Sequence, residues 1–515
     1  MGVLCNCFDT FAIGFQYYCK GKESFVNFAL LAMELNWIFW VAVALLVAYL
    51  ILLLGEVSRL ILENRSPVRT LAWLVVLITL PFIGIFLFYA LGLNYRKRKI
   101  YSSKGLGDLR WLNFMSEDQR DLLRKRKILQ GRHWATERKL ITLLLNNNKA
   151  LLTVNNNLAV YNSGDNSFQA IFQAIANAKR FIHLEFYIVE EGELFSRLYT
   201  LLLSKLSEGV EVRFIYDDVG SWSLSKQSVE GLRKAGAKIY PFLPLRVHRK
   251  KANYRNHRKI VVVDGSMAFM GGVNIADRYI YGSKIGRWRD TLLRIEGEAV
   301  MALHIIFLID WYFVSQEVLL DRALYLPTTN EGEGSMAQIV SSGPDSDWDS
   351  IHQAYVAMVN MAENHVYIST PYFMPSDVML SALKSAAMSG VDVKLMLPIR
   401  TDSFLTYWSS CSYVEELLVA GVKVFFFKPG INHSKVVSVD GRIAAVGSAN
   451  MDMRSLEQNF EVSMIIYDKE VVEIIESDFK DDLTLCSTVE YDEWIKRPRL
   501  NQIKESLSRL FSPIL

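Results

Sequence analysis

The chain has 515 residues, of which 51% are hydrophobic and 22% are charged, and its formal net charge is only +3 at pH 7. This balance carries no overall signature of nucleic-acid binding, and the length leaves room for two catalytic lobes beside other segments. The five cysteines are an odd number without metal-site spacing, so reduced thiols are expected rather than a disulfide framework.

Two uncharged apolar runs lie near the N-terminus, at residues 35–55 and 70–95. At 1.5 Å per residue they would form helices of about 31 and 39 Å, and a hydrocarbon core is about 30 Å thick. A buried hairpin in a soluble core is disfavoured, because such helices do not need apolar residues on every face. We therefore predict a two-helix transmembrane hairpin within residues 35–95, with the second helix kinked near Pro81. Residues 1–34 lack a cleavable signal peptide and are assigned no role.

Basic residues give the expected orientation of this hairpin. A cluster follows the second run and outweighs the arginines of the connection between the runs: Arg96, Lys97, Arg98 and Lys99 against Arg59, Arg65 and Arg69. Because cytoplasmic loops carry the excess of Lys and Arg, the catalytic region is expected in the cytoplasm. The connection, residues 56–69, is amphipathic and could instead lie in the membrane interface. Residues 96–150 are expected to be a basic juxtamembrane linker.

The rest of the chain contains two related halves, residues 151–325 and 326–490. Residues 170–188, AIFQAIANAKRFIHLEFYI, parallel residues 354–374, AYVAMVNMAENHVYISTPYFM, and each predicts an amphipathic helix that leads into a strand. Such internal similarity indicates a structural repeat. Strands that alternate with helical segments predict α/β lobes with mainly parallel or mixed sheets, packed so that equivalent sites meet at one cleft.

One motif occurs in each half, as HRKIVVVDGSMAFMGGVN at residues 257–274 and HSKVVSVDGRIAAVGSAN at residues 433–450. A His and a Lys two apart on a strand share a face, and the Val-rich run after each Lys predicts a buried strand. A lone His in such a strand is usually a core residue, but a duplicated His–Lys pair indicates a catalytic site. The candidate catalytic residues are His257, Lys259, Asp264, His433, Lys435 and Asp440.

These residue types suit chemistry on a phosphodiester. A neutral imidazole can attack phosphorus to give a phosphohistidine, while a second, protonated imidazole protonates the leaving alkoxide and later deprotonates the acceptor alcohol. Charge that builds on the phosphate oxygens needs cations and amide donors, and the candidates for that role are Lys259, Lys435, Asn274 and Asn450. Asp264 and Asp440 follow the buried strands, which favours a structural ion pair over proton transfer.

The two motifs resemble those of the phospholipase D superfamily, and further segments are similar to the bacterial cardiolipin synthases. These segments are NYRNHRK at residues 253–259, WRD at residues 288–290 and TPYFMP at residues 370–375, and the resemblance covers residues 65–515. It implies two lobes related by pseudo-twofold symmetry. It also implies a carboxylate farther along each half that orients the histidine of that half, which gives Asp290 and Glu461.

The resemblance further implies an activity. A phosphatidyl group would pass from one phosphatidylglycerol to the terminal hydroxyl of another, giving cardiolipin and glycerol without a metal or other cofactor. The enzyme would be a multi-pass protein of the bacterial inner membrane whose partners are anionic phospholipids rather than nucleic acid. By analogy His257 is the nucleophile and His433 the general acid and then base, but the symmetric motifs leave that order open.

Several other functions are compatible with parts of this pattern. A phospholipase D hydrolase or a phosphatidylserine-type transferase would share the histidines and differ only in whether water, serine or a lipid alcohol reaches the phosphohistidine. A nuclease is disfavoured, since it gives no reason for a membrane anchor and no basic groove interleaved with aromatic residues is present. A non-catalytic scaffold is disfavoured because both motifs are intact.

Two surface features bear on the substrate. A basic group precedes His257 and would either attract anionic phosphate or form an ordinary solvated surface: Arg246, His248, Arg249, Lys250, Lys251 and Arg255. The tail, residues 491–515, has apolar residues at helical spacing: Ile503, Leu507, Leu510 and Phe511. This spacing predicts an amphipathic helix that either rests on the membrane or packs against the second lobe.

Overall fold

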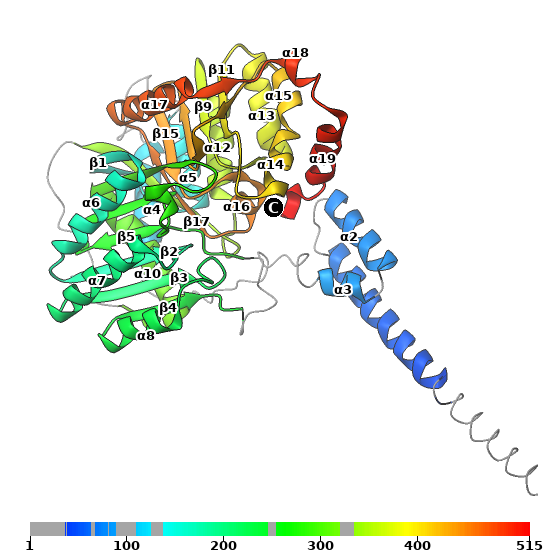
Figure 1. Ribbon diagram of the computed structural model, residues 1–515, viewed down its shortest axis with the longest axis horizontal. Coiled ribbons are helices and arrows are strands. Elements are labelled where there is room, and N and C mark those ends of the chain that lie inside the picture. The colour runs from blue at the N-terminus through cyan, green and yellow to red at the C-terminus, as the bar shows by residue number, and fades with distance from the viewer. Residues whose placement is uncertain are drawn as a thin grey trace, which may run out of the picture. The chain divides into compact units, whose positions relative to one another are not determined.

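The computed structural model describes residues 37, 39–62, 67–80, 82–88, 110–124, 137–245, 254–319 and 334–514 (Figure 1). The chain divides into two compact units, Met1–Leu93 and Asn94–Leu515. The N-terminal segment at residues 1–34 and the basic cluster at residues 96–99 lie outside the described residues.

The first unit contains a helix of 24 residues, Phe39–Leu62, whose apolar side chains are almost all exposed. At 1.5 Å per residue it is about 36 Å long, enough to cross a bilayer. It runs past the predicted end at residue 55, because Glu56 and Arg59 lie on successive turns and form an ion pair at 3.5 Å. Part of the predicted connection is therefore helical.

The second apolar run differs from the prediction of one kinked helix. Helix α2 (Pro67–Thr79) ends before Pro81, and the short helix α3 (Ile83–Leu87) begins after Phe82, whose φ is 63°. A proline removes a backbone donor and clashes with the preceding turn, which stops α2 at 13 residues, or about 20 Å. A Cβ on Gly84 would lie 2.5 Å from the carbonyl oxygen of Val76, so this close approach requires glycine.

The first lobe of the second unit alternates strands with helices as predicted. Its elements are β1 (Thr153–Ser163), α6 (Gly164–Ala176), β2 (Phe181–Phe186), α7 (Glu193–Ser207), β3 (Glu211–Asp217), α8 (Lys226–Lys234), β4 (Lys238–Phe242), β5 (Ile260–Val263), β6 (Met267–Gly271), α9 (Arg278–Tyr281), β7 (Arg287–Gly297) and α10 (Glu298–Ser315). Helix α10 is apolar and long enough to span a membrane, but 44% of its most apolar window is buried, and Leu303, His304 and Trp311 lie in the lobe interior.

The second lobe repeats this order and adds a C-terminal extension. Its elements are β8 (Ser335–Ser342), α12 (Ser350–Met361), β9 (His365–Ser369), β10 (Phe373–Met374), α13 (Asp377–Met388), β11 (Asp392–Pro398), α14 (Phe404–Cys411), α15 (Val414–Val419), β12 (Lys423–Phe427), β13 (Gly430–Asn432), β14 (Val436–Val439), β15 (Ile443–Gly447), β16 (Met451–Asp452), α16 (Met453–Glu457), β17 (Glu461–Ile466) and α17 (Lys469–Thr484). The extension contains β18 (Cys486–Thr488), α18 (Tyr491–Trp494), α19 (Arg499–Arg509) and the short helix η6 (Ser512–Ile514).

The strands of both lobes join in one 16-stranded mixed sheet within the described residues. Strands β1 and β8 pair at the junction. Outward from there the first lobe runs β1-β7-β6-β5-β2-β3-β4, and the second runs β8-β17-β15-β14-β9-β11-β12. Each of these fourteen strands has a counterpart at the same distance from the junction, so the duplication seen in the sequence is also a duplication of topology. The second lobe adds β18 beyond β12 and β13 beside β7, while β10 and β16 form a separate two-stranded sheet.

Both motif strands are buried on their two faces, as their Val-rich runs predicted. In β5, Ile260 and Val262 pack in a central cluster with residues of both lobes, while Val261 and Val263 pack under the helices of the first lobe. In β14, Val436 joins the same central cluster, while Val437 and Val439 face the helices of the second lobe. This shared core holds the two motif strands rigidly near each other.

The segment predicted as a linker at residues 96–150 contains two helices, α4 (Arg110–Arg124) and α5 (Glu137–Asn147). Helix α5 belongs to the second lobe, since Leu140, Ile141 and Leu144 are fully buried in the core of that lobe. The apolar residues of ERKLITLLLNN recur at helical spacing, which fits a helix packed on the lobe rather than a linker.

Candidate active site

Both motif histidines lie in one cleft between the lobes. The cleft has a volume of about 310 Å³, and its lining includes His257, His433, Asn274, Asn450 and the side chains of Tyr187, Arg278, Tyr279, Tyr372 and Arg454. The histidines precede β5 and β14, where the sheet stops and its polar ends face the cleft. The predicted meeting of the two motifs is thus present in the structure.

Each histidine is fixed through its backbone to the opposite lobe. The amide of His257 donates to the carbonyl of Phe460, 2.9 Å away, and the amide of His433 donates to the carbonyl of Arg289, 2.6 Å away. Phe460 directly precedes Glu461 and Arg289 directly precedes Asp290, so these backbone bonds bring a carboxylate beside each imidazole.

The carboxylate partners are exchanged between the lobes. Nδ1 of His257 lies 3.0 Å from Oε2 of Glu461, and Nδ1 of His433 lies 2.6 Å from Oδ2 of Asp290. The residues expected as orienting carboxylates are therefore both in place, but the expectation that each serves the histidine of its own half is wrong. Because Nδ1 of each ring faces a carboxylate, the neutral rings carry their proton there, which leaves Nε2 with its lone pair.

The glycine pair element of each motif makes room for these carboxylates. A Cβ on Gly272 would lie 2.1 Å from Oδ1 of Asp290, so only glycine leaves space for that side chain. The equivalent residue of the second motif is Ser448, and its hydroxyl donates a hydrogen bond to Glu461. At this position the glycine of the first motif leaves space for Asp290, and the serine of the second motif donates a hydrogen bond to Glu461.

Both motif lysines are buried beside the histidines. Nζ of Lys435 lies 2.8 Å from Nδ1 and 3.3 Å from Nε2 of His433, and 4.0 Å from Asp290. Nζ of Lys259 donates to the carbonyl of His257 at 2.5 Å and lies over the ring of Tyr187. Two ammonium groups therefore flank the space between the imidazoles.

Burial controls the protonation of the site. It lowers the pKa of His257 and of His433 to about 4, so both rings are neutral at pH 7. Burial also lowers the pKa of Lys435 to about 8 and that of Lys259 well below its usual range. Burial raises the pKa of Asp290, but Lys435 and His433 outweigh it, so that pKa lies below its ordinary value and the carboxylate stays charged.

Asp264 and Asp440 directly follow β5 and β14, at the opposite ends of these strands from the histidines, which precede them. Each carboxylate accepts three backbone N–H bonds at 2.7–2.9 Å, from Lys179, Arg180 and Phe181 or from Glu363, Asn364 and His365. Both aspartates have a positive φ, 54° and 56°. Their partners among the described residues are backbone amides, so the expected ion pair is not what holds them.

The two motif asparagines both line the cleft but differ in their hydrogen bonds. Oδ1 of Asn274 accepts from the amide of Ile188 at 3.1 Å, and its Nδ2 donates to the hydroxyl of Tyr279 at 2.8 Å. Oδ1 of Asn450 has no hydrogen-bond partner among the described residues, although the side chain is buried. The side-chain oxygen of Asn450 is therefore open to a hydrogen-bond donor in the cleft, whereas its Nδ2 is the group that can donate to a phosphate oxygen.

Sequence reasoning missed an asparagine directly before each histidine. Oδ1 of Asn256 and of Asn432 accepts the amide of the residue after the histidine, at 3.1 Å in both lobes. Their amide nitrogens reach carboxylates, the buried Glu185 at 2.5 Å and the partly buried Asp482 at 3.3 Å. The signal was present, because both motifs read Asn-His-x-Lys.

A second missed pair is Arg278 and Arg454, each four residues after its motif asparagine. Both line the cleft. Arg278 pairs with Glu190 at 2.6 Å and lies over the ring of Trp288, whereas Nε of Arg454 is buried without a hydrogen-bond partner among the described residues. The common spacing in NIADR and NMDMR was the sequence signal.

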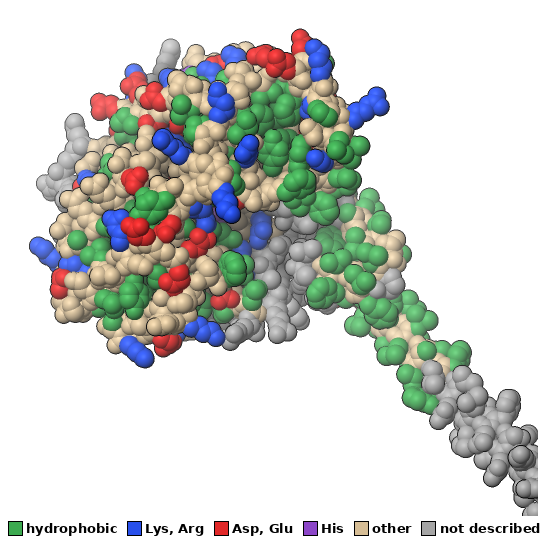
Figure 2. Space-filling model, viewed as in Figure 1, with side chains coloured by type: hydrophobic (Ala, Val, Ile, Leu, Met, Phe, Trp, Pro, Cys, Tyr) green, Lys and Arg blue, Asp and Glu red, His purple; other side chains and the backbone are tan. Residues whose placement is uncertain are grey.

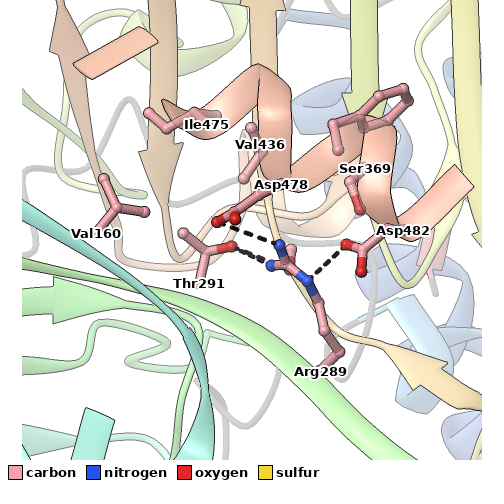
Figure 3. A pocket seen from close by; sticks show the side chains of 10 residues that line it. Val160, Arg289, Thr291, Ser369, Val436, Ile475, Asp478 and Asp482 are labelled. Atoms are coloured by element: carbon pink, nitrogen blue, oxygen red, sulfur yellow. Dashed lines mark hydrogen bonds and ion pairs between the residues drawn. The ribbon is translucent and has the colours of Figure 1, made fainter. Parts of the chain in front are cut away.

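Arg289 supports the second motif from outside the cleft, at a cavity of about 10 Å³ (Figure 3). Its guanidinium pairs with Asp482 at 2.6 Å and with Asp478 at 3.8 Å, both on α17, and donates to Ser434 at 2.6 Å. In the first lobe the corresponding support comes from a residue of the motif, Arg258, which pairs with Asp310 of α10. Each site thus rests on an arginine bound to a later helix, the buried Arg258 in the first lobe and the partly buried Arg289 in the second.

The basic group expected before His257 is only partly described. Residues 246–251 lie outside the described residues. Arg255 is buried and pairs with Asp217 at 3.4 Å, so this arginine supports the fold rather than an exposed phosphate-attracting surface. Within the described part of the chain, no group of three or more His, Cys, Asp or Glu side chains is placed to hold a metal ion.

Comparisons with known proteins agree with this geometry. A family model described as cardiolipin synthase, PLD-like domain, matches residues 171–305 and 355–483, and one described as phospholipase D-nuclease N-terminal matches residues 38–92. A cardiolipin synthase of Geobacillus sp. (strain WCH70) is 40% identical over 88% of this chain and 90% of its own. Cardiolipin synthase 2 of Bacillus anthracis is 42% identical over 88% of each chain. The crystal structure of phosphatidylserine synthase from Haemophilus influenzae Rd KW20 superposes with a TM-score of 0.57 at 13% identity, over 74% of this chain and all of that one, which shows the shared fold.

Proposed function

This chain belongs to the cardiolipin synthase family, and on that premise we propose that it is a phosphatidyltransferase that makes cardiolipin and glycerol from two phosphatidylglycerol molecules. One observation carries the proposal. Two neutral imidazoles, one from each lobe, present Nε2 to a single cleft of about 310 Å³ that is also lined by cationic side chains. Such a cleft suits a glycerophosphate headgroup whose acyl chains remain outside it.

In the first step, Nε2 of one histidine attacks the phosphorus of the first lipid. A P–N bond forms as the bond from phosphorus to the glycerol headgroup oxygen breaks, and the second imidazole, protonated, gives its proton to that oxygen. By family resemblance His257 attacks and His433 donates. Both rings have a lowered pKa, so the anionic phosphate itself must favour the protonated form of the donor when it enters the cleft.

In the second step, the terminal hydroxyl of the second phosphatidylglycerol occupies the place of the departed glycerol. The neutral second imidazole takes its proton, the oxygen attacks phosphorus, and the P–N bond breaks to release cardiolipin and free the first histidine. Exclusion of water by the acyl chains of the second lipid favours transfer over hydrolysis.

Cationic and amide groups would hold the phosphate in both steps. Lys259 and Lys435 flank the histidines, and we assign the phosphate oxygens to them together with Asn450 and Arg454. Preorganised donors at a buried site stabilise developing negative charge strongly, because they need no reorganisation. Asn274 is engaged with Tyr279 and would position that hydroxyl, which lies 3.4 Å from Nδ1 of His433.

The N-terminal unit would anchor the enzyme in the bacterial membrane. The helix Phe39–Leu62 is long enough to span it, and we propose that residues 70–95 supply a second crossing that returns the chain to the cytoplasm. A fluorescent protein fused to the C-terminus is expected to fluoresce, whereas an alkaline phosphatase fusion at the same point should be inactive. The opposite pair of results would place the catalytic unit outside the cytoplasm.

The product distribution tests the activity. Purified, detergent-solubilised enzyme is incubated with labelled phosphatidylglycerol in the presence of EDTA, and the lipids are resolved. Cardiolipin with an equal amount of free glycerol is expected. Phosphatidic acid alone would mean that water is the acceptor, and a requirement for added metal would contradict the metal-free mechanism.

The order of the two histidines is tested separately. His257→Ala and His433→Ala should each abolish transfer. With labelled substrate, the variant that lacks the acid and base should still retain some covalent label on the protein, and the variant that lacks the nucleophile should retain none. Label in His433→Ala alone is expected; label in His257→Ala alone would reverse the roles, and normal turnover in either variant would sink the two-histidine mechanism.

A further inference from the structure

Helix α19 is packed with its apolar side outward. The side chains it buries are Glu505 and Ser508, each 3% exposed, whereas Ile503 and Leu507 are 54% and 57% exposed. A helix that docks on a protein core normally buries its apolar stripe. The predicted tail helix is therefore present and packs against the second lobe, which is one of the two predicted placements, but its apolar stripe faces outward.

Polar contacts hold α19 in this inverted orientation. Arg497 binds both carboxylate oxygens of Glu505 at 2.8–3.1 Å, and Arg509 pairs with Glu416 of α15 at 2.7 Å. After the helix, the hydroxyl of Ser512 is 2.7 Å from that of Ser409 on α14. These bonds determine which side of α19 faces the protein. The outward position of its apolar side is therefore part of the fold.

The outward side continues into the neighbouring helix α14. Phe404 at the start of α14 is 67% exposed, and Leu500, Leu510 and Phe511 extend the same apolar character along the tail. The tail face is defined here as Phe404, Leu500, Ile503, Leu507, Leu510 and Phe511. Figure 2 shows hydrophobic side chains gathered on the side of the molecule where α13, α14 and α19 lie in Figure 1.

The tail face adjoins the active-site cleft. Asp402, Ser403 and Thr406, which flank Phe404 at the start of α14, line the cleft that contains both histidines. Helix α14 also packs on α19 through Lys504, whose ammonium lies over the ring of Trp408. One short helix thus connects the wall of the cleft to the apolar side of the tail.

Positive charge borders the tail face. Lys496 and Arg499 are exposed beside its first apolar residue, and Lys504 and Arg509 lie partly exposed within it. Apolar side chains edged by Lys and Arg are typical of helices that lie in the interface of an anionic bilayer, with the apolar side among the acyl chains.

We propose that the tail face docks on the anionic lipid bilayer and holds the mouth of the cleft against the membrane surface. This inference rests on the proposed function, because a phospholipid substrate would then enter the cleft without leaving the bilayer. Docking would place the headgroup inside the cleft and leave the acyl chains at Phe404 and α19.

A lipid cross-linking experiment tests the docking directly. Full-length protein in phosphatidylglycerol vesicles carries the photoreactive residue p-benzoylphenylalanine in place of Leu507 or, as a control, in place of Ile474, which is exposed on α17. Illumination should attach radiolabelled lipid at position 507 and not at position 474. Equal labelling at the two positions, or a protein dimer at 507 in place of a lipid adduct, would overturn the proposal.

A substrate comparison tests the consequence for turnover. Ile503→Glu and Ile474→Glu replace isoleucines with exposed fractions of 54% and 53% on two different helices. Ile503→Glu should reduce turnover of phosphatidylglycerol in vesicles by about tenfold and leave turnover of monomeric short-chain phosphatidylglycerol unchanged. Ile474→Glu should change neither.

Equal vesicle turnover in the two variants would overturn the docking proposal while cardiolipin formation, and so the proposed function, still stands. A failure of the unaltered enzyme to form cardiolipin from either substrate would instead reject the proposed function, and lipid labelling at position 507 would still decide the docking.

Discussion

Nδ1 of His257 in the first lobe lies 3.0 Å from a carboxylate oxygen of Glu461 in the second lobe. The reciprocal pair, His433 with Asp290, has the same crossed arrangement. Each lobe therefore supplies an imidazole for its own motif and an orienting carboxylate for the other. Neither half contains a complete site, so the junction of the lobes is part of the catalytic apparatus.

The crossed pairing predicts which histidine each carboxylate controls. Glu461→Gln should alter the ¹⁵N-histidine NMR signal of His257, because its Nδ1 proton loses a charged acceptor, while Asp290→Asn should alter that of His433. Each change should lower kcat by about 10- to 100-fold, the usual cost of losing an orienting partner.

Signals are assigned with His257→Asn and His433→Asn, each of which removes one resonance. If Glu461→Gln altered only His433 and Asp290→Asn altered only His257, the pairing would lie within each lobe, and the crossed arrangement would be rejected.

Much of the site could be predicted from the sequence, because the same residues recur at the same spacing in both halves. Two copies of His-x-Lys at the start of Val-rich strands mark a shared face and a shared cleft. The exchange of Asp290 and Glu461 between the lobes could not be predicted. Each carboxylate follows the motif histidine of its own half in the sequence, and this spacing does not show which of the two histidines it contacts. The pairing of β13 with β7, which sets Asn432 opposite Arg289, and the bridge between Asn256 and Phe460 bring each carboxylate beside the histidine of the other lobe.

The N-terminal unit shows a different limit. Hydropathy predicts the first helix, because the uncharged run is long enough to form one. It does not predict that the helix continues past Glu56, where the residues are charged and form an ion pair. The sequence predicts a kink near Pro81, but hydropathy does not distinguish a kinked helix from a helix that ends before a proline. The positive φ of Phe82 and the close contact of Gly84 with Val76 depend on packing.

Arg289 is predicted to be a positioning residue for His433. It holds Ser434 next to His433, and its carbonyl accepts the amide of that histidine, while its guanidinium is anchored to Asp482. Arg289→Ala should lower kcat by about 10- to 100-fold with little change in KM, because the substrate does not reach it. Steady-state kinetics on monomeric short-chain phosphatidylglycerol measure this split.

The matched control for Arg289 is Arg294→Ala on the same strand, since Arg294 is partly exposed and pairs with Glu296. It should retain full activity. Arg289→Lys should recover part of kcat through its single charge. A purely structural role would instead lower the amount of active enzyme in Arg289→Ala and leave kcat per active site unchanged.

Asp264 is predicted to stabilise the fold without taking part in proton transfer. Its carboxylate accepts three backbone amides at the start of β2, and asparagine tolerates its positive φ of 54°. Asp264→Asn should therefore weaken these bonds by about 1–3 kcal/mol and lower Tm by a few degrees, with kcat of the folded enzyme unchanged. Asp440→Asn should behave alike, and a loss of kcat at unchanged Tm would assign a chemical role.

The pH dependence follows from the buried bases of the cleft. The imidazole that attacks must be neutral and the donor imidazole must carry a proton, and both rings of the free enzyme have a pKa of about 4, so kcat/KM should fall as pH drops below about 4 and also decline as pH rises above it. The phosphate clamp needs a charged Lys435, so this decline should become steeper as pH rises through about 8, where that ammonium loses its proton. The profile is measured with monomeric short-chain phosphatidylglycerol, whose phosphodiester stays ionised throughout this range.

Lys435→Arg identifies the alkaline limb of this profile. A guanidinium remains protonated in proteins, so the variant should lose activity overall through its altered geometry but show no steepening of the decline near pH 8. The acid limb should stay near pH 4, because burial of the histidines is its largest cause. Since His433 and Lys435 interact closely, each limb reports the cleft as a coupled unit. A steepening near pH 8 that persisted in Lys435→Arg would assign it to another group and remove Lys435 from the phosphate clamp.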